Sequence, residues 1–256
     1  MFIDFTHRVY YDYGRKSVAK TTDSYAGRNF LKGCDIPVDC AFLSCTPLFR
    51  GIKAEEIEQL LHCLHAVQRG YKKGEAIYKM GGTAPAIGLV LSGNVTIEND
   101  DVWGNRSVLD SVGPGQVFAE TYACLPDEPL MVSVVAAEHT EVLFLRAAQL
   151  LSPCATACGR HVQLIRNLLS VSAQKNLTLS RRIFHTSAKT IRERLLSYLS
   201  FQAIRQSSDR FSIPFNRQQL ADYLGVDRSA LSKEMSKMRA AGLIDFQKNL
   251  FELKRP

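Results

Sequence analysis

The sequence predicts an α+β protein that consists of an N-terminal β-roll (jelly roll), a long helix and a C-terminal winged helix-turn-helix. Short β-type runs between glycine turns fill residues 71–145, and a helical pattern covers residues 154–183. After these, the chain follows the order helix, turn, helix, hairpin. The predicted parts are an irregular arm over 1–46, the roll over 47–152, the long helix over 153–184 and the winged helix-turn-helix over 185–256.

The segment before the roll divides into an arm and a helix. Residues 1–45 carry aromatic residues, charges and three cysteines without strand or helix periodicity, which indicates an irregular arm. From Pro47 to Val67, apolar residues recur at helical spacing behind a pair of glutamates. This range is therefore predicted to be a short amphipathic helix.

The predicted roll consists of short strands with glycine turns between them. The β-type runs are "AIYKM", "AIGLVLSGNVTIEND", "RSVLDSVGPGQVF" and "LMVSVVAAEHTEVLFL". Chain reversals are expected at Gly74, Gly81-Gly82, Ser92-Gly93, Gly104 and Gly113-Pro114-Gly115, where glycine permits positive φ and proline fixes φ. Such regular spacing is typical of a small closed roll.

The long helix has two apolar seams. One contains Leu164, Leu168 and Val171, and the other contains Ile165, Leu169, Leu179 and Ile183. Together they form a stripe wider than a single β-roll would cover. The pattern favours a dimerisation helix over the alternative, a helix buried wholly within one chain.

The C-terminal segment has the caps and the turn of a helix-turn-helix. Asn216 is a good N-cap for a first helix, Gly225 allows the tight turn, and Asp227 caps a second helix. The second helix is predicted to bury Ala230, Leu231, Met235 and Met238, which leaves an open face of Arg228, Ser229, Ser232, Lys233 and Ser236. "LIDFQKNLFELK" then alternates as the two strands of a wing.

The net charge supports a polyanionic partner for this segment. Residues 181–256 hold 15 Lys and Arg against 7 Asp and Glu, a net charge of +8, whereas residues 1–180 sum to −1. Arg and Lys on the open face suit guanine edges in the major groove of DNA. A protein-docking winged helix and a merely solvated basic surface are the alternatives.

The whole chain has the composition of a cytoplasmic protein. No apolar run approaches the length of a membrane helix, because Glu138, Glu141 and Arg146 interrupt the most apolar stretch, so no membrane partner is expected. The N-terminus lacks the pattern of a secretion signal. Seven cysteines in a reducing compartment favour free thiols, metal ligands or redox groups over disulfides.

These features together resemble the Crp/Fnr superfamily of bacterial transcription regulators. The resemblance covers residues 47–253 and is carried by "YKKGEAIYKMGG", "GLVLSGNVTI", "SVGPGQVFAE" and, most specifically, "FNRQQLADYLGVDRSALSKEMSKMRAAGLI". It implies a homodimer on a palindromic site in double-stranded promoter DNA, with RNA polymerase as a further partner if the protein is an activator.

The resemblance also implies roles for individual residues. Arg228, Ser229, Ser232 and Lys233 match the base-contacting positions of the family, and Asn216 and Gln218 match its phosphate-contacting start of the first helix. Many members have glutamate where this chain has Ser229, so the DNA site is expected to differ from theirs.

The resemblance further places a candidate effector site in the roll. Glu120 matches a ribose-contacting carboxylate, but Leu130 and Met131 fall where the cyclic-nucleotide branch has a phosphate-binding arginine and a small hydroxyl. A phosphate buried there would have no charge to offset its desolvation. This argues against cyclic AMP and leaves a different small molecule as the predicted effector.

The cysteines offer an alternative, a redox, oxygen or metal sensor. Cys34, Cys40 and Cys45 resemble in place, but not in spacing, the iron-sulfur ligands of the oxygen-sensing branch, and Cys124 is a candidate fourth ligand. Cys154, Cys158 and His161 share one helical face, as a metal or thiol pair would need, or as simple packing would also give. Haem needs only one axial His or Cys and stays open.

A metal-dependent enzyme is the contrasting class, because β-rolls also house oxygenases. Such sites need two or three histidines that converge from the strands. Between Tyr71 and Leu151 the sequence holds a single histidine, His139. The sequence therefore predicts a regulator and not an enzyme.

Overall fold

The structure is a computed structural model that describes residues 38–100, 106–125, 127–151 and 159–254. Two short helices, α1 (Cys40–Ser44) and α2 (Ala54–Cys63), precede the roll. Its strands and helices are β1 (Val67–Tyr71), β2 (Ala76–Tyr78), β3 (Ala86–Ser92), β4 (Val95–Asp100), β5 (Arg106–Val112), β6 (Val117–Phe118), α3 (Glu120–Ala123), β7 (Ser133–Ala136), β8 (Thr140–Arg146) and α4 (Ala147–Leu151).

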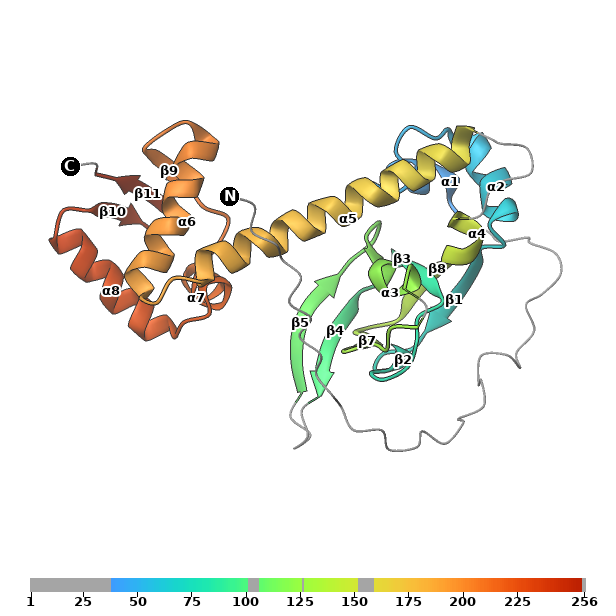
Figure 1. Ribbon diagram of the computed structural model, residues 1–256, viewed down its shortest axis with the longest axis horizontal. Helices are drawn as coiled ribbons and strands as arrows, with labels where there is room; N and C mark the ends of the chain where they lie inside the picture. Colours follow the sequence, from blue (N-terminus) through green and yellow to red (C-terminus); the bar gives the residue numbers. More distant parts are fainter. Residues whose placement is uncertain (1–37, 101–105, 126, 152–158, 255–256) are drawn as a thin grey trace, which may run out of the picture. The chain divides into compact units, whose positions relative to one another are not determined.

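The roll consists of two four-stranded antiparallel sheets, as the glycine-punctuated runs predicted. Their strand orders are β1-β8-β3-β6 and β2-β7-β4-β5, and β4 pairs with β5 as the hairpin drawn in green in Figure 1. The sheets enclose an apolar core that includes Ile77, Tyr78, Phe118 and Val142. Gly88 on β3 lies directly under the ring of Phe118, because a Cβ there would be 2.1 Å from the ring.

Two expectations for the segment before the roll were wrong in detail. Residues 40–44 form α1, because the Asp39 carboxylate accepts hydrogen bonds from the N–H groups of Ala41 and Phe42, so the arm is not irregular throughout. A helix of five residues is too short to show periodicity. The helix predicted from Pro47 to Val67 is confined to Ala54–Cys63, after the positive-φ turn at Gly51.

The predicted long helix is α5 (Gly159–Thr186), which ends two residues beyond the expected end at 184. Its predicted start lies among residues 152–158, outside the described residues. The first predicted seam packs inside the chain, since Leu164 and Leu168 are buried. The second seam is largely uncovered, because Leu169, Leu179 and Ile183 are 69%, 60% and 67% exposed.

The C-terminal domain, drawn from orange to red in Figure 1, has the predicted order of elements. These are α6 (Ile191–Gln206), β9 (Arg210–Ser212), α7 (Arg217–Leu224), α8 (Arg228–Ala240), β10 (Ile244–Gln247) and β11 (Leu250–Leu253). The three strands pair in the order β10-β11-β9. Leu199, Leu220, Leu231, Met235 and Phe251 meet in one buried core, which fixes α8 against the rest of the domain.

Candidate nucleic-acid interface and sensor site

The turn between α7 and α8 follows from three residues of the sequence. Asn216 caps α7 in a reciprocal pair with Gln219: each side chain accepts a 2.9 Å hydrogen bond from the other residue's N–H. Gly225 ends α7 in the left-handed conformation (φ 63°, ψ 45°). Val226 then packs against the domain core, so the chain turns sharply into α8.

The N-terminus of α8 is organised by Asp227. Its Oδ1 accepts hydrogen bonds from the Ala230 N–H at 2.8 Å and from the Ser229 hydroxyl at 2.5 Å. These two hydrogen bonds, first that from Ser229, hold the pKa of the Asp227 carboxyl below its usual value. Ser229, the position where many family members have glutamate, therefore belongs to the cap of the helix.

The open face of α8 is the one that the sequence predicted. Arg228, Ser229, Lys233 and Ser236 are exposed and Ser232 is half-buried, whereas Leu231, Met235 and Met238 are fully buried. Ala230 differs slightly from expectation, since it is only half-buried. Asn216 and Gln218 at the start of α7 are also exposed.

Contacts with α6 fix the orientation of α8. Arg192 Nε lies 2.7 Å from Glu234 Oε1, an ion pair between α6 and α8. Arg194 donates to the carbonyl oxygens of Leu224 at 3.1 Å and Gly225 at 3.3 Å, and so satisfies the C-terminal end of α7. The exposed face of α8 is thus carried on a helix that is held from behind.

The wing contains a cluster that sequence analysis missed. The ring of Phe246 on β10 contacts two guanidinium groups, with Arg239 Cζ 3.8 Å and Arg217 Cζ 5.0 Å from its centroid. Arg239 also pairs with Asp245 at 2.8 Å. The sequence could have given only a weak signal, because these residues come from α8, α7 and the wing.

In the roll, the predicted effector residue Glu120 is held by a lysine of α5. Glu120 begins α3 after Ala119, which has a positive φ of 59°. The buried Glu120 carboxylate lies 2.9 Å from Lys175 Nζ, and the same ammonium donates to the Val117 carbonyl at 2.7 Å. The charge of Glu120 is therefore compensated within the chain.

The other two predicted effector residues, Leu130 and Met131, differ in burial. Leu130 is 2% exposed and packs in the roll core, whereas Met131 is 72% exposed. Neither side chain can neutralise an anion. The structure therefore does not gather Glu120, Leu130 and Met131 into one polar pocket.

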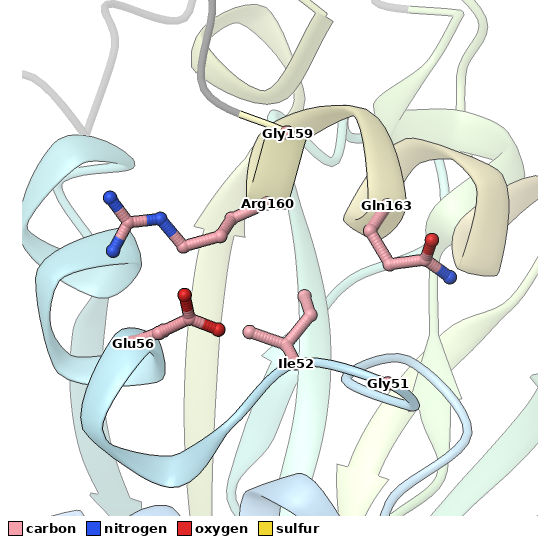
Figure 2. Close-up of a pocket in the computed structure, with 6 residues that line it drawn as sticks. All are labelled: Gly51, Ile52, Glu56, Gly159, Arg160 and Gln163. Atoms are coloured by element: carbon pink, nitrogen blue, oxygen red, sulfur yellow. The ribbon is translucent and has the colours of Figure 1, made fainter.

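Two cavities border α5. One, of about 580 Å³, is lined by the loop at Leu48, the β5–β6 turn and the face of α5 that contains Asn167 and Lys175. The other, of about 520 Å³, is shown in Figure 2, where the Arg160 side chain extends from α5 above Glu56, and Ile52 lies beside Glu56. Both volumes lie within the range of small-molecule sites.

The cysteine predictions are only partly within the described residues. Cys34, Cys154 and Cys158 lie outside them. Burial, and secondly Glu58 and Asp39, raises the pKa of the Cys40 thiol, while burial and Glu120 raise that of Cys124. Cys45 is exposed. In the part of the chain that the structure describes, no three His, Cys, Asp or Glu side chains gather as a metal site.

The other histidines of the sequence analysis are His161 and His139, which lie in different environments. His161 is buried, and its Nε2 lies 2.7 Å from the Leu150 carbonyl oxygen, a contact that ties α5 to α4. His139 is exposed in the turn before β8. Within the described ranges, neither belongs to a group of three or more side chains that could hold a metal ion.

His185, at the end of α5, is enclosed by aromatic rings. It is 1% exposed, with the rings of Tyr198, Phe201 and Tyr223 centred 5.7, 5.4 and 6.2 Å away. Its Nδ1 lies 2.9 Å from the Ser197 hydroxyl, whereas its Nε2 has no hydrogen-bond partner in the described part of the chain. Burial lowers the pKa of His185, so the neutral ring is favoured.

Two family models match the chain. Residues 68–156 match the cyclic nucleotide-binding domain, and residues 193–256 match the Crp-like helix-turn-helix domain. No helix in the described residues has both the length and the apolar character needed to cross a membrane.

Relatives match across both domains. The "Cyclic AMP receptor protein" of Thermus thermophilus is 27% identical over 201 residues, which cover 78% of this chain and 88% of that protein. The "Transcriptional regulatory protein btr" of Bordetella pertussis is 24% identical over 206 residues, covering 78% and 81%. The solved structure "OCPA complexed CprK (C200S)" has a TM-score of 0.54 at 15% identity, covering 78% and 89%, and so shares the fold.

The enclosed His185 makes the stability of the chain depend on pH. Because burial lowers the folded-state pKa of His185 below the ordinary histidine value of 6.5, the unfolded chain binds the extra proton first as the pH falls. The contribution of the neutral His185 ring to the free energy of unfolding is therefore fully present above pH 6.5. It is lost as the pH falls through the folded-state pKa. The neighbouring Tyr198, with a pKa of about 12, does not titrate in this window, and the charged group nearest to the rings is the Arg181 guanidinium, with its Cζ 5.4 Å from the centroid of Phe201.

The measurement is urea unfolding of the full chain at several pH values between 5 and 8, with circular dichroism as the readout. His185→Gln should remove part of the acid destabilisation that wild type shows. Exposed His139→Gln is the matched control and should leave the wild-type profile unchanged. Parallel pH profiles for wild type and His185→Gln would contradict the assignment.

Proposed function

Since this chain belongs to the Crp/Fnr superfamily of transcription regulators, we propose that it binds promoter DNA as a homodimer under the control of a small-molecule effector. The chain is a regulator and not an enzyme, in agreement with the sequence prediction. The finer elements of the proposal concern the DNA contacts, the dimer and the effector.

The observation that carries the DNA proposal is the exposed basic face on a firmly held α8. Arg228 and Lys233 stand on the solvent side of the helix whose other side is buried. A helix with this division can enter the major groove and place its N-terminal turns against base edges. Asn216 and Gln218, exposed at the start of α7, are proposed to contact phosphates on the flank.

The dimer proposal rests on the uncovered seam of α5. Val162, Ile165, Leu169, Leu179 and Ile183 lie on one coiled-coil seam of three- and four-residue steps. Between Leu169 and Leu179, polar Ser172 and Asn176 fill the two intermediate positions of that seam. Most of them are large apolar side chains that water would otherwise surround. A second copy of α5 would bury this seam, and the resulting two-fold symmetry matches a palindromic DNA site.

The effector is proposed to act next to α5. The cavity of about 580 Å³ is lined by roll residues on one side and by α5 on the other, so a ligand there would alter how α5 packs. A change in that packing would alter the distance between the two α8 helices of the proposed dimer. The proposal does not extend to cyclic AMP. The Glu120 carboxylate already forms an ion pair with Lys175, and Leu130 is buried in the roll core, where it offers no charge to a phosphate.

The first test is Lys233→Ala in α8. Removal of a base-contacting ammonium should weaken binding about tenfold, because a good base contact contributes about 1–3 kcal/mol of discrimination. The probe is a duplex enriched from a random-sequence pool by the wild-type protein, and the readout is fluorescence anisotropy at moderate salt. Lys79→Ala, an exposed lysine in the roll region, is the control and should bind as wild type does.

Unchanged affinity of Lys233→Ala would show that the base-contacting assignment is wrong. Failure of the wild type to enrich any sequence would reject the DNA-binding proposal itself.

The second test is Leu179→Glu in the exposed seam. A charge on each copy at the seam should prevent close packing of two α5 helices and convert a dimer into a monomer. Sedimentation velocity measures the result directly. Thr178→Glu, at an exposed α5 position off the seam, adds the same charge and should remain dimeric. A wild-type monomer, or a dimeric Leu179→Glu, would refute the seam assignment.

The third test concerns cyclic AMP. A ligand at one hundred times its dissociation constant stabilises a fold by about 2.7 kcal/mol, which raises the melting temperature by several degrees. Cyclic AMP at millimolar concentration should leave the melting temperature of this protein unchanged, with sodium phosphate of equal ionic strength as the blank. A reproducible rise with cyclic AMP alone would overturn this part of the proposal.

A further inference from the structure

The last turn of α5 is fixed to the winged domain by the side chain of His185. This ring is 1% exposed, whereas the two residues before it, Ile183 and Phe184, are 67% and 69% exposed. The rings around His185 come from other helices, with Tyr198 and Phe201 on α6 and Tyr223 on α7. His185 is therefore the side chain by which the end of α5 is inserted between α6 and α7.

The hydrogen bonding of His185 suits the neutral ring alone. Its Nδ1 lies 2.9 Å from the Ser197 hydroxyl, and its Nε2 has no partner within the described residues. A protonated imidazole has an N–H group on both nitrogens. Its N–H at Nε2 would then be buried without an acceptor, which costs more for a charged group than for a neutral one.

Two arginines of α5 lie next to the same rings. Arg181 Cζ is 5.4 Å from the centroid of Phe201, so this ring already has a cation over it. The Arg182 guanidinium donates to the Asp222 carbonyl oxygen at 3.2 Å, and its charge acts on the Tyr223 hydroxyl. A cation on His185 would be a further positive charge in this neighbourhood.

The groups of α6 and α7 do not supply a compensating negative charge. On α6, Tyr198 has a pKa of about 12 and stays neutral, and the charge that acts on it from the same helix is that of Arg205. On α7, burial raises the pKa of Tyr223, so it also stays neutral. The exposed Asp222 carboxylate accepts a hydrogen bond from Gln218 at 2.8 Å. Among the described ion pairs, none joins a carboxylate to His185.

Protonation of His185 is therefore compatible with the ring in water and not with the ring in its present place. A buried cation without a counter-charge is relieved when its side chain moves into solvent. Because His185 is the inserted side chain of the last α5 turn, its departure would detach the end of α5 from α6 and α7.

We propose that His185 is an acid-sensitive lock between α5 and the winged domain, which holds the domain for DNA binding when it is neutral and releases it when it is protonated. This inference rests on the proposed function and adds control by protons to it. Ile183 of the proposed dimer seam lies two residues before His185, so the lock connects the seam to the domain that carries α8. Two held domains bind a palindromic site as one unit, whereas two released domains bind it through flexible connections, at a lower effective concentration.

The lock sets the direction of the pH dependence. Burial lowers the folded-state pKa of His185, so DNA affinity should be complete above pH 6.5 and should fall as the pH drops through that lowered pKa. One proton per subunit limits the fall to about tenfold per pH unit and per subunit.

The test measures the affinity of the full chain for the wild-type-enriched duplex between pH 5 and 8 at constant ionic strength. Fluorescence anisotropy gives the dissociation constant, and circular dichroism at each pH monitors the fold. The wild type should lose affinity by about threefold or more at the acid end, with its circular dichroism unchanged. The quantity compared between variants is the ratio of the affinities at the two ends of the range, because a constant loss of affinity leaves that ratio unchanged.

Three variants isolate His185. His185→Gln and His185→Phe cannot take up a proton, and both should lose the acid-induced fall in affinity. Phenylalanine also keeps a ring among the aromatic side chains. His139→Gln, an exposed position before β8, is the matched control and should keep the wild-type ratio.

Nuclear magnetic resonance of the chain labelled with carbon-13 at histidine tests the lock without DNA. The ring signal of His185, identified by its loss in His185→Gln, should remain that of a neutral ring at pH values where the His139 signal already titrates. Titration of His185 together with His139 would overturn the lock.

The DNA measurement has equally definite outcomes. Affinity of the wild type that does not depend on pH, an acid-induced fall that persists in both His185 variants, or its loss in His139→Gln would overturn the lock. So would a fall in affinity that follows a loss of circular dichroism, since that result indicates unfolding. If the wild type binds the duplex at pH 8, each of these failures leaves the proposed function intact, whereas a wild type that enriches no duplex rejects the proposed function itself.

Discussion

The division of α5 into two faces is the constraint on which the arrangement of the roll and of the proposed dimer seam depends. On the inner face, the buried Asn167 amide donates to the Leu48 and Arg50 carbonyl oxygens at 2.9 and 2.8 Å. Lys175 on α5 pairs with Glu120. Buried polar groups are costly unless they are satisfied, so these contacts fix which side of α5 faces the roll. The opposite side of α5, which contains Leu169, Leu179 and Ile183, is left exposed.

In the winged domain, several contacts support α8 from behind. Caps at Asn216 and Asp227 begin the two helices, Arg192 pairs with Glu234 from behind, and the Phe246 stack connects the wing to both helices. Each contact leaves the outer side of α8 free. A site whose supporting contacts are already made loses less freedom on binding, which favours both affinity and selectivity.

Two residues near the ends of the contacts made by α5 are held in unfavourable states. His185 lies at the end of α5 among rings of α6 and α7, and Ala119 holds a positive φ directly before Glu120. A buried neutral histidine and a left-handed alanine each carry a free-energy cost that the surrounding packing offsets.

The sequence by itself determined the features that depend on local chemistry. Asn216, Gly225 and Asp227 specify caps and a turn within a few residues, and glycine spacing specifies the strands of the roll. Even so, α1 was missed, because five residues around an Asp39 cap carry no periodic signal.

Only the tertiary structure decided which distant side chains meet. Lys175 and Glu120, or Arg217, Phe246 and Arg239, are far apart in the chain, and neither spacing nor composition indicates that they are neighbours. Leu130 and Met131 illustrate the same limit: the sequence places them next to each other, but the fold buries one and exposes the other. Long-range contacts depend on how whole elements pack, and that packing is set by the complete core rather than by any local pattern.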